Sequence, residues 1–153
     1  MMSLIILPYT KERIPDAVDF EKRLRQEEDF WGWEIDDTYL AAVEKSFCDE
    51  RFSPSLSLLA YREGKVVGRI DSTLICSHFD GSVKAYLDWI CVIKSARHQG
   101  VAQALMENLQ AQLKERNVDT LIALTSQNED AQRFYKSLPH SQMRDMGIWI
   151  DIK

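Results

Sequence analysis

The segment that decides the fold reads Tyr86-Leu87-Asp88-Trp89-Ile90-Cys91-Val92-Ile93, then Lys94-Ser95-Ala96-Arg97-His98-Gln99-Gly100-Val101-Ala102. Its first part is apolar on both faces except at Asp88, which is typical of a strand in the middle of a sheet. Apolar residues recur at helical spacing from Val101 onward, so the strand passes through a short loop into a helix. The first N–H groups of a helix have no acceptor inside it and lie at the positive end of its dipole. The segment therefore predicts an anion site at the start of this helix.

Three residues of the loop suit a bulky phosphate group. Gly100 lets the main chain approach a pyrophosphate, Ala102 keeps the first helical turn slim, and Arg97 can add a charged contact. We therefore expect a phosphorylated carrier as the ligand. The alternative is an ordinary loop glycine before a helix, and this alternative would win on Gly100 alone. The chain lacks Gly-x-Gly-x-x-Gly and Gly-x-x-x-x-Gly-Lys-Ser/Thr, which argues against a nicotinamide or nucleoside triphosphate site.

Periodicity places the other elements on both sides of this segment. The first expected helix has Pro15 at an early position and runs up to the Glu27-Glu28-Asp29 cluster. The others are residues 37–49 and 101–116, and a short helix that Asn128 or Ser126 caps and Pro139 ends. The expected strands are Leu4–Tyr9, Ser57–Arg62, Lys65–Cys76, Lys84–Ile93, Thr120–Thr125 and Gly147–Ile152. Early hairpins and a later strand-helix-strand crossover predict an α/β (α+β) fold, with a mixed, mostly antiparallel sheet and helices on both faces. We expect one domain over residues 1–153, since 45% hydrophobic residues suffice for a core.

The composition argues against several classes of function. A net charge of -5 disfavours a nucleic-acid partner, which would need a basic face. The apolar start is too short for a signal peptide or a membrane span, so no membrane association is expected. The three cysteines lack Cys-x-x-Cys spacing and the three histidines are scattered, so neither disulfides nor a metal site is expected. A reducing cytoplasm fits this composition best.

The stretch from Tyr86 to Tyr135 resembles the GNAT superfamily of N-acetyltransferases. The family signature Gln/Arg-x-x-Gly-x-Gly/Ala at a helix start is matched by Arg97-His98-Gln99-Gly100-Val101-Ala102. Val92 matches the valine that ends the family's hydrophobic strand, and the motif Asn-x-x-Ala-x-x-Phe/Leu-Tyr is matched by residues 128–135. Pro139-His140 replaces the Gly-Phe that commonly follows, so the terminal hairpin is expected to be short or irregular.

The resemblance implies acetyl-coenzyme A as the co-substrate and no metal. It places the pantetheine arm along the central strand and the pyrophosphate on the N–H groups of Gln99 to Ala102. The residues that it implies for the coenzyme are Ile90, Cys91, Val92, Arg97, His98, Gln99, Gly100, Val101, Ala102, Asn128, Ala131 and Tyr135.

Asp88 is the candidate catalytic base. Transfer to an amine needs the neutral nucleophile, and a carboxylate in an otherwise apolar central strand requires a reason. The alternative is a structural ion pair, for example with Arg69. Acidic residues on this strand in similar family members favour the base.

Tyr135 is the candidate general acid for the departing thiolate. An aromatic residue on the apolar face of a short helix is usually core, and the residues alone favour that reading. The resemblance instead places the family's catalytic tyrosine on Tyr135 and leaves Phe134 as packing.

The amine acceptor is expected at the segment from Phe30 to Tyr39. Its aromatic rings and carboxylates suit a cationic amine, although tryptophans that fill the core are an equal alternative for any one of them. Family members often line the acceptor site with this region. We therefore predict acceptor contacts from Trp31, Trp33, Glu34 and Asp37, and Asp71 either joins them or faces solvent.

The expected function is transfer of an acetyl group from acetyl-coenzyme A to a primary amine of a small cationic acceptor. The alternatives are a protein acetyltransferase, acting on an N-terminus or a lysine, and an acyl-coenzyme A sensor that has lost catalysis. Survival of Tyr135 and Asp88 beside an intact loop favours the enzyme. The oligomeric state stays open, with a homodimer among the options.

Overall fold

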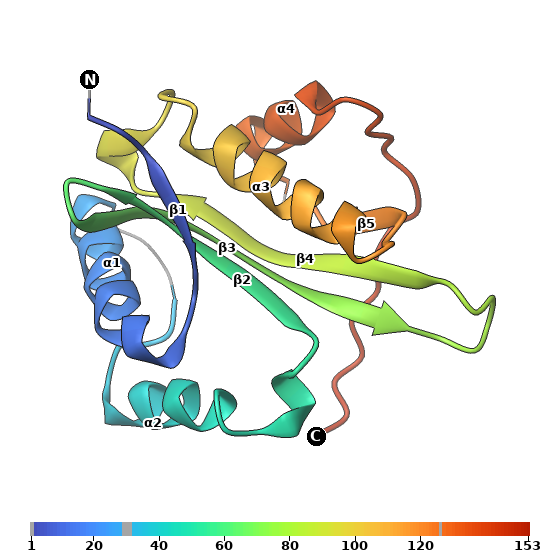
Figure 1. Cartoon of the computed structure of the whole chain (residues 1–153), viewed down its shortest axis with the longest axis horizontal. Helices are drawn as coiled ribbons and strands as arrows, with labels where there is room; N and C mark the ends of the chain where they lie inside the picture. The colour runs from blue at the N-terminus through green and yellow to red at the C-terminus, as the bar shows by residue number, and fades with distance from the viewer. Residues whose placement is uncertain (1, 29–31, 126) are drawn as a thin grey trace. The chain divides into compact units, whose positions relative to one another are not determined.

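The computed structural model describes residues 2–28, 32–125 and 127–153. The chain divides into two compact units, Met1–Ile122 and Ala123–Lys153. Figure 1 shows the elements along the chain. The elements of the first unit are β1 (Ile5–Pro8), α1 (Ile14–Glu27), α2 (Asp37–Ser46), β2 (Ser55–Arg62), β3 (Lys65–Cys76), β4 (Val83–Val92) and α3 (Val101–Glu115). Strand β5 (Thr120–Ala123) crosses the boundary between the units, and α4 (Glu129–Ser137) belongs to the second.

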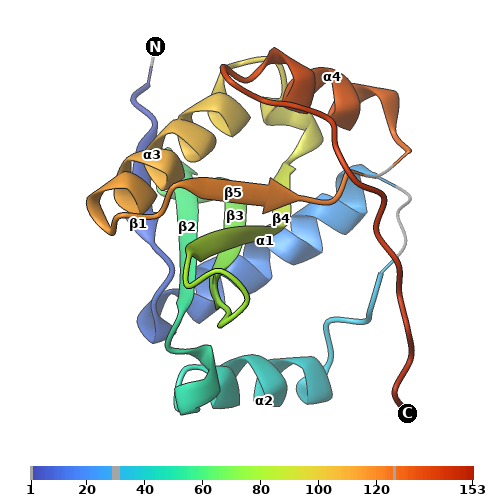
Figure 2. The same cartoon turned by 90° about the vertical axis from the view of Figure 1, so that its right-hand side faces the viewer.

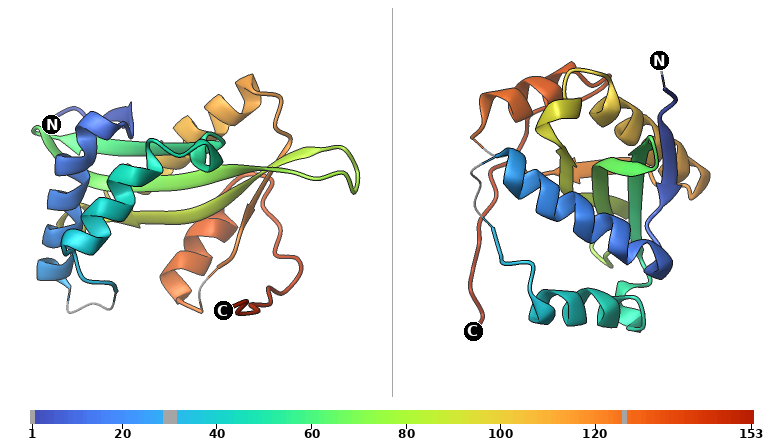
Figure 3. Two further views of the ribbon diagram at one scale, coloured as in Figure 1. Left: turned by 90° about the horizontal axis from the view of Figure 1, so that it is seen from below. Right: turned by 90° about the vertical axis from the view of Figure 1, so that its left-hand side faces the viewer.

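The five strands form one sheet in the order β1-β2-β3-β4-β5. Strands β1 to β4 pair with one another antiparallel, and α3 connects β4 to β5. The paired ends of β3 and β4 extend beyond the other strands as a long hairpin (Figure 3). The predicted fold class, a mostly antiparallel sheet with helices, is confirmed.

Helices α1 and α3 pack on opposite faces of the sheet (Figure 2). A Cβ atom on Gly68 would lie only 2.9 Å from Val101 Cγ1 of α3. The next residue of β3, Arg69, instead donates to Glu21 of α1. Because successive side chains of a strand point to opposite faces, even-numbered residues of central β3 face α3 and odd-numbered ones face α1.

Two helix packings supply most of the core. From α1, Phe20 and Leu24 are almost fully buried, and from α3, Leu105 and Leu109 have no exposed surface. Each helix carries these residues three or four positions apart, which gathers them on one stripe. The sheet is therefore covered on both faces, and odd-numbered polar residues of β3 such as Arg69 lie on the face that α1 covers.

The predicted helix over residues 37–49 is shorter in the structure. Helix α2 ends at Ser46, and a separate 3-10 turn forms over Glu50–Phe52. Asp49 begins the new turn because its carboxylate accepts a hydrogen bond from the backbone N–H of Arg51 at 2.9 Å. The remaining first-unit elements lie within two residues of the predicted bounds.

The predicted last strand, Gly147–Ile152, is wrong. Residues 141–153 have no helix or strand assignment, and the large apolar side chains in this stretch are exposed. Ile148 is 84% exposed and Ile152 88%. A strand needs a neighbouring strand to satisfy its backbone groups, and no ladder to this segment occurs in the described part of the chain. Alternating apolar residues alone could not supply that partner.

Candidate functional site

The loop before α3 presents main-chain groups rather than side chains. Gly100 is the N-cap of α3 with φ +80°, and no side chain caps this helix end. A Cβ atom at this position would meet no atom within 4 Å, so the space beside the glycine is open. The N–H groups of the first turn, from Val101 to Gln103, have no acceptor within the helix, as the predicted anion site would require.

Two side chains of this loop bind back to the protein. The guanidinium of Arg97 pairs with both carboxylate oxygens of Glu28 at 2.5 and 3.0 Å and donates to the Val92 carbonyl at 3.0 Å. Gln99 accepts from Arg62 and donates to the Ser95 carbonyl at 3.1 Å. The charged contact that we predicted from Arg97 to a phosphate would thus compete with Glu28.

A second pair of contacts fixes the same loop to the end of α1. Glu27 accepts from the Ser95 N–H at 2.8 Å and from the Ser95 hydroxyl at 2.7 Å. These hydrogen bonds hold the pKa of the Glu27 carboxyl below its usual value. We call Glu27, Glu28, Ser95 and Arg97 the α1 clasp. The clasp fixes the loop without using its main-chain donors at the helix start.

The strand residues expected along the coenzyme lie on both faces of β4. Ile90 and Val92 pair across from Ile70 and Gly68 and therefore face α3. Cys91 pairs with Arg69 and faces α1. Burial raises the pKa of the Cys91 thiol to about 11, so it is a thiol rather than a thiolate at neutral pH.

Asp88 is the extra residue of a β-bulge. Asp71 pairs with Trp89 and Ser72 with Leu87, which leaves Asp88 without a partner on β3. A bulge bends its strand and redirects a side chain, and the Asp88 side chain is exposed and lines a cavity. Arg69 pairs instead with Glu21 and Asp71, so the ion pair considered for Asp88 is not formed.

The cavity has a volume of about 1150 Å³ and lies entirely within the first unit. Its lining comes mainly from odd-numbered residues of β2 and β3, from β4, and from α1, α2 and the turn that follows α2, with Tyr9 and Trp33 from the loops. It is large enough for a ligand of several hundred daltons.

Among the described lining residues, carboxylates outnumber cations. The acidic residues are Glu21, Asp49, Glu50, Asp71 and Asp88, and the basic ones are Arg51 and Arg69. Both arginines are paired with carboxylates, Arg51 with Asp49 and Arg69 with Glu21 and Asp71. The excess of negative charge favours a cationic ligand.

The predicted acceptor residues divide in the structure. Trp33 and Asp71 line the cavity, whereas Glu34 and Asp37 are not among the described lining residues. Trp31 lies outside the described residues.

The sequence analysis missed much of the lining. The missed residues include Tyr9, Glu21, Phe47, Ser57 and Thr73. Alternating polar positions in the two hairpin strands, such as Ser55 and Ser57, or Arg69, Asp71 and Thr73, are a signal that could have located this face.

Of the remaining predicted site residues, His98 lies in the loop before α3 with φ +59°, and the others belong to the second unit. Asn128 caps α4, as expected, by accepting from the N–H groups of Asp130 and Ala131 at 2.9 and 3.2 Å. Tyr135 is half-buried, and its ring centroid lies 5.5 Å from that of Phe134. Within its unit, Asn128 thus has a structural role, and its contact with the coenzyme stays a prediction.

Two further features concern the described residues as a whole. They contain no group of three or more His, Cys, Asp or Glu side chains that could hold a metal ion. None of their helices is both long enough and apolar enough to span a bilayer.

Comparisons with known proteins give a family match and many structural neighbours. The Acetyltransferase (GNAT) family matches residues 22–138. No curated protein sequence matches significantly.

Three solved structures illustrate the likeness. The first is an aminoglycoside acetyltransferase, meta-AAC0020 from an uncultured soil metagenomic sample, in complex with trehalose. It is 17% identical to this chain, the match covers 98% of this chain and 97% of that one, and the TM-score is 0.81. AAC(6')-Iy, in complex with the bisubstrate analogue CoA-S-monomethyl-acetylneamine, is 21% identical with a TM-score of 0.77, over 97% and 98%. Ribosomal-protein-alanine N-acetyltransferase from Brucella melitensis biovar Abortus 2308 is 19% identical with a TM-score of 0.75, over 97% and 98%. At these identities, the likeness establishes the fold.

Proposed function

We propose that this chain, which belongs to the GNAT family of acetyltransferases, transfers the acetyl group of acetyl-coenzyme A to a primary amine of a small cationic acceptor. The observation that carries the proposal is the uncapped start of α3, with Gly100 in a left-handed conformation and open space beside it. This arrangement supports a pyrophosphate held by main-chain N–H groups.

The residues present fit coenzyme A. The loop side chains of Arg97 and Gln99 are held by other residues, which leaves the main chain from Gly100 to Ala102 as the binding surface. The coenzyme supplies an activated acetyl thioester. We propose that Ile90, Cys91 and Val92 lie along its pantetheine arm, and that Asn128, Ala131 and Tyr135 contribute through α4. A relative of this fold is known with a coenzyme A bisubstrate analogue.

The cavity supports an acceptor that is small and positively charged. Its lining combines an excess of carboxylates with the aromatic rings of Trp33, Tyr39 and Trp89. Aromatic faces and carboxylates both attract ammonium groups. Structural neighbours described as aminoglycoside acetyltransferases agree with this chemistry.

Asp88 is proposed as the base that prepares the amine. An alkylamine with a pKa of about 10.4 is neutral at pH 7 in only about one of a few thousand molecules, which adds about 4 to 5 kcal/mol to the barrier. The exposed carboxylate on the β4 bulge can accept the ammonium proton directly or through water. The freed nitrogen lone pair then bonds to the acetyl carbonyl carbon, and the second proton that this nitrogen loses as the amide forms passes to solvent water.

Tyr135 is proposed as the acid that protonates the departing sulfur as the carbon–sulfur bond breaks. A main-chain N–H of β4 near Val92 is proposed to stabilise the negative charge that develops on the carbonyl oxygen. Support for Tyr135 comes from its place in the matched motif at residues 128–135.

The direct test measures release of free thiol from acetyl-coenzyme A with a panel of amines and, separately, coenzyme binding by calorimetry. Thiol release that depends on an amine supports the enzyme. Binding without thiol release for any amine would favour the sensing module, and transfer only to peptides would favour a protein acetyltransferase.

The coenzyme site has its own variant, Gly100→Glu. The new carboxylate would lie beside the N–H groups that we assign to the pyrophosphate, and φ +80° disfavours any side chain. We expect acetyl-coenzyme A binding to be lost while the circular dichroism spectrum stays that of the wild type. Unchanged affinity would refute the phosphate assignment.

A further inference from the structure

A buried carboxylate connects two walls of the cavity. Glu21 of α1 is only 2% exposed. One of its oxygens binds Arg25 Nη1 at 2.7 Å and the other binds Arg69 Nη1 at 3.1 Å. A buried charge is stable only when it is paired and hydrogen-bonded, and Glu21 meets this condition by binding two cations.

The first cation, Arg25, contacts the aromatic residues that line one side of the cavity. Arg25 lies one turn after Glu21 on α1 and also donates to the Glu21 carbonyl at 2.7 Å. Its guanidinium carbon lies 5.4 Å from the ring centroid of Trp33. Trp33 in turn stacks on Tyr39 at 6.3 Å and meets Trp89 edge-on at 6.4 Å. All three aromatic residues line the cavity.

The second cation, Arg69, contacts polar residues of the cavity lining. Arg69 binds Asp71 through two hydrogen bonds, of 2.8 and 3.0 Å, and lies over the Tyr9 ring at 5.2 Å. Burial by itself lowers the pKa of Arg69, but Asp71 and Glu21 more than offset this effect, so the pKa lies above its usual value and Arg69 stays charged. Tyr9 packs against Phe47 of the opposite wall at 5.1 Å.

From this geometry we propose that Glu21 is a positioning residue of the acceptor site, which sets Trp33 through Arg25 and sets Asp71 and Tyr9 through Arg69. The inference rests on the proposed function, because it takes the cavity as the place of the amine. The guanidinium groups of both arginines contact residues that line the cavity, Trp33 for Arg25 and Asp71 for Arg69. A buried ion network adds little stability compared with apolar residues of the same volume, so a role in the site explains the network better than stability does.

The test is the Glu21→Gln variant, which keeps the shape of the side chain and removes its charge. With the best amine of the panel, we expect the KM for the amine to rise about tenfold, as for loss of a part-buried cation–π contact. The KM for acetyl-coenzyme A should stay within about twofold, because the start of α3 lies outside the network. An equal rise in both KM values, or no rise in the amine KM, would overturn the proposal.

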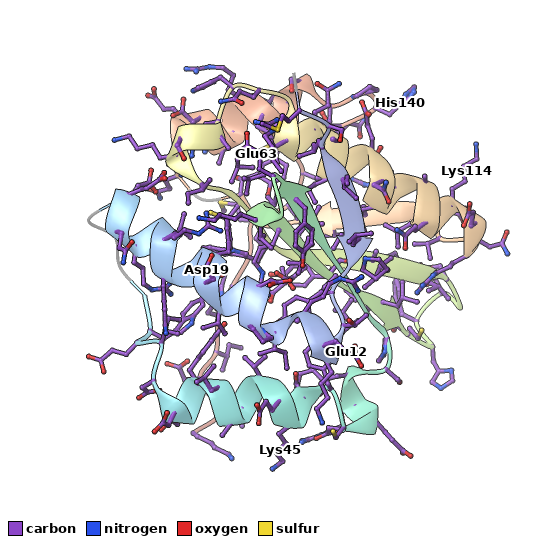
Figure 4. The ribbon with its side chains drawn as sticks, turned by 60° about the vertical axis from the view of Figure 1, so that its left-hand side comes forward. Glu12, Asp19, Lys45, Glu63, Lys114 and His140 are labelled. Atoms are coloured by element: carbon purple, nitrogen blue, oxygen red, sulfur yellow. The ribbon has the colours of Figure 1, made fainter. Side chains whose placement is uncertain are left out.

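The matched control is Asp19→Asn on the same helix. Asp19, labelled in Figure 4, forms the same kind of pair four residues apart, with Arg23 at 2.7 Å, and its side chain is 57% exposed. It does not line the cavity. We expect wild-type kinetics from this variant, and an amine KM that rises as it does in Glu21→Gln would overturn the proposal.

A second variant tests the route through Trp33 even if Glu21→Gln fails to fold. Arg25→Gln removes only the cation between Glu21 and Trp33 and leaves Arg69 in place, and the Arg25 side chain is 21% exposed. If Arg25 acts through the tryptophan, the double variant Arg25→Gln/Trp33→Leu has the same amine KM as Trp33→Leu alone. Additive losses would overturn the proposal. Absence of amine-dependent thiol release by the wild type would overturn the proposed function as well, which separates the two failures.

Discussion

The Asp88 carboxylate occupies the one residue of β4 that lies opposite no residue of β3. Its neighbours Leu87 and Trp89 keep their places in the ladder, so the bulge exposes this side chain without interrupting the sheet. An exposed carboxylate at the edge of a cavity can exchange protons with a ligand or with water. This placement supports the proposed base.

Replacing this carboxylate should produce a pH-dependent defect. We expect Asp88→Asn to lower kcat/KM about 100-fold near neutral pH, since a positioned base is worth about that much. The loss should shrink as the pH rises toward about 10, where the amine becomes neutral in solution. The measurement is the pH profile of the rate relative to wild type, with the exposed Asp119→Asn as control. A ratio that stays constant with pH would contradict the role.

The Tyr135 hydroxyl should matter for turnover rather than for binding. We expect Tyr135→Phe to lower kcat about 100-fold, because it removes only a proton donor. Acetyl-coenzyme A affinity, measured by calorimetry, should change by less than about twofold. Full activity of the variant would leave Tyr135 as a packing residue.

Elements with a strong local pattern could be predicted from the sequence. Strand β3 has the predicted bounds, since Glu63-Gly64 and the polar turn after Cys76 mark both of its ends. The same holds for the start of α3 after Gly100. The end of α2 could not be predicted, because apolar spacing continues past Ser46 and the new turn depends on one hydrogen bond from Asp49.

The segment after α4 shows where such patterns mislead. Ile148, Ile150 and Ile152 alternate as in a half-buried strand, yet all three are more than two-thirds exposed. We expect the triple replacement of these residues by Ser to change the free energy of unfolding by less than about 0.5 kcal/mol, as exposed substitutions do.

Chemical denaturation of the triple variant measures this free energy. The apolar surface that the segment exposes makes solubility the property most open to change. A loss of more than about 1 kcal/mol would mean that the segment packs as a strand after all.

Over the whole molecule, the coenzyme side was easier to predict than the acceptor side. The loop at Gly100 is a contiguous signal, because strand, glycine and helix follow one another in the chain. The cavity instead gathers Tyr9, Glu21, Trp33 and Asp71 from four separate segments. These residues come together only through the antiparallel pairing of the strands and the packing of α1. Their proximity therefore could not be predicted from any single stretch of the sequence.

The distribution of charge in the cavity also depends on the fold rather than on any local stretch of sequence. Twenty-four acidic against nineteen basic residues give the net charge of -5, which by itself disfavours only nucleic acid. The fold places five of the carboxylates around one cavity and pairs both of its arginines. The composition thus gave no ligand, whereas the acidic lining of the cavity supports a cationic one.

The α1 clasp has a consequence for protein engineering. Glu27 and Glu28 are separated by more than sixty positions from Ser95 and Arg97, which they hold. A chimera with the loop of another acetyltransferase and this first helix would lose the hydrogen bonds of Glu27 and Glu28 wherever the new loop lacks Ser95 or Arg97. Grafts at this corner should therefore exchange both segments at once, as a single cassette.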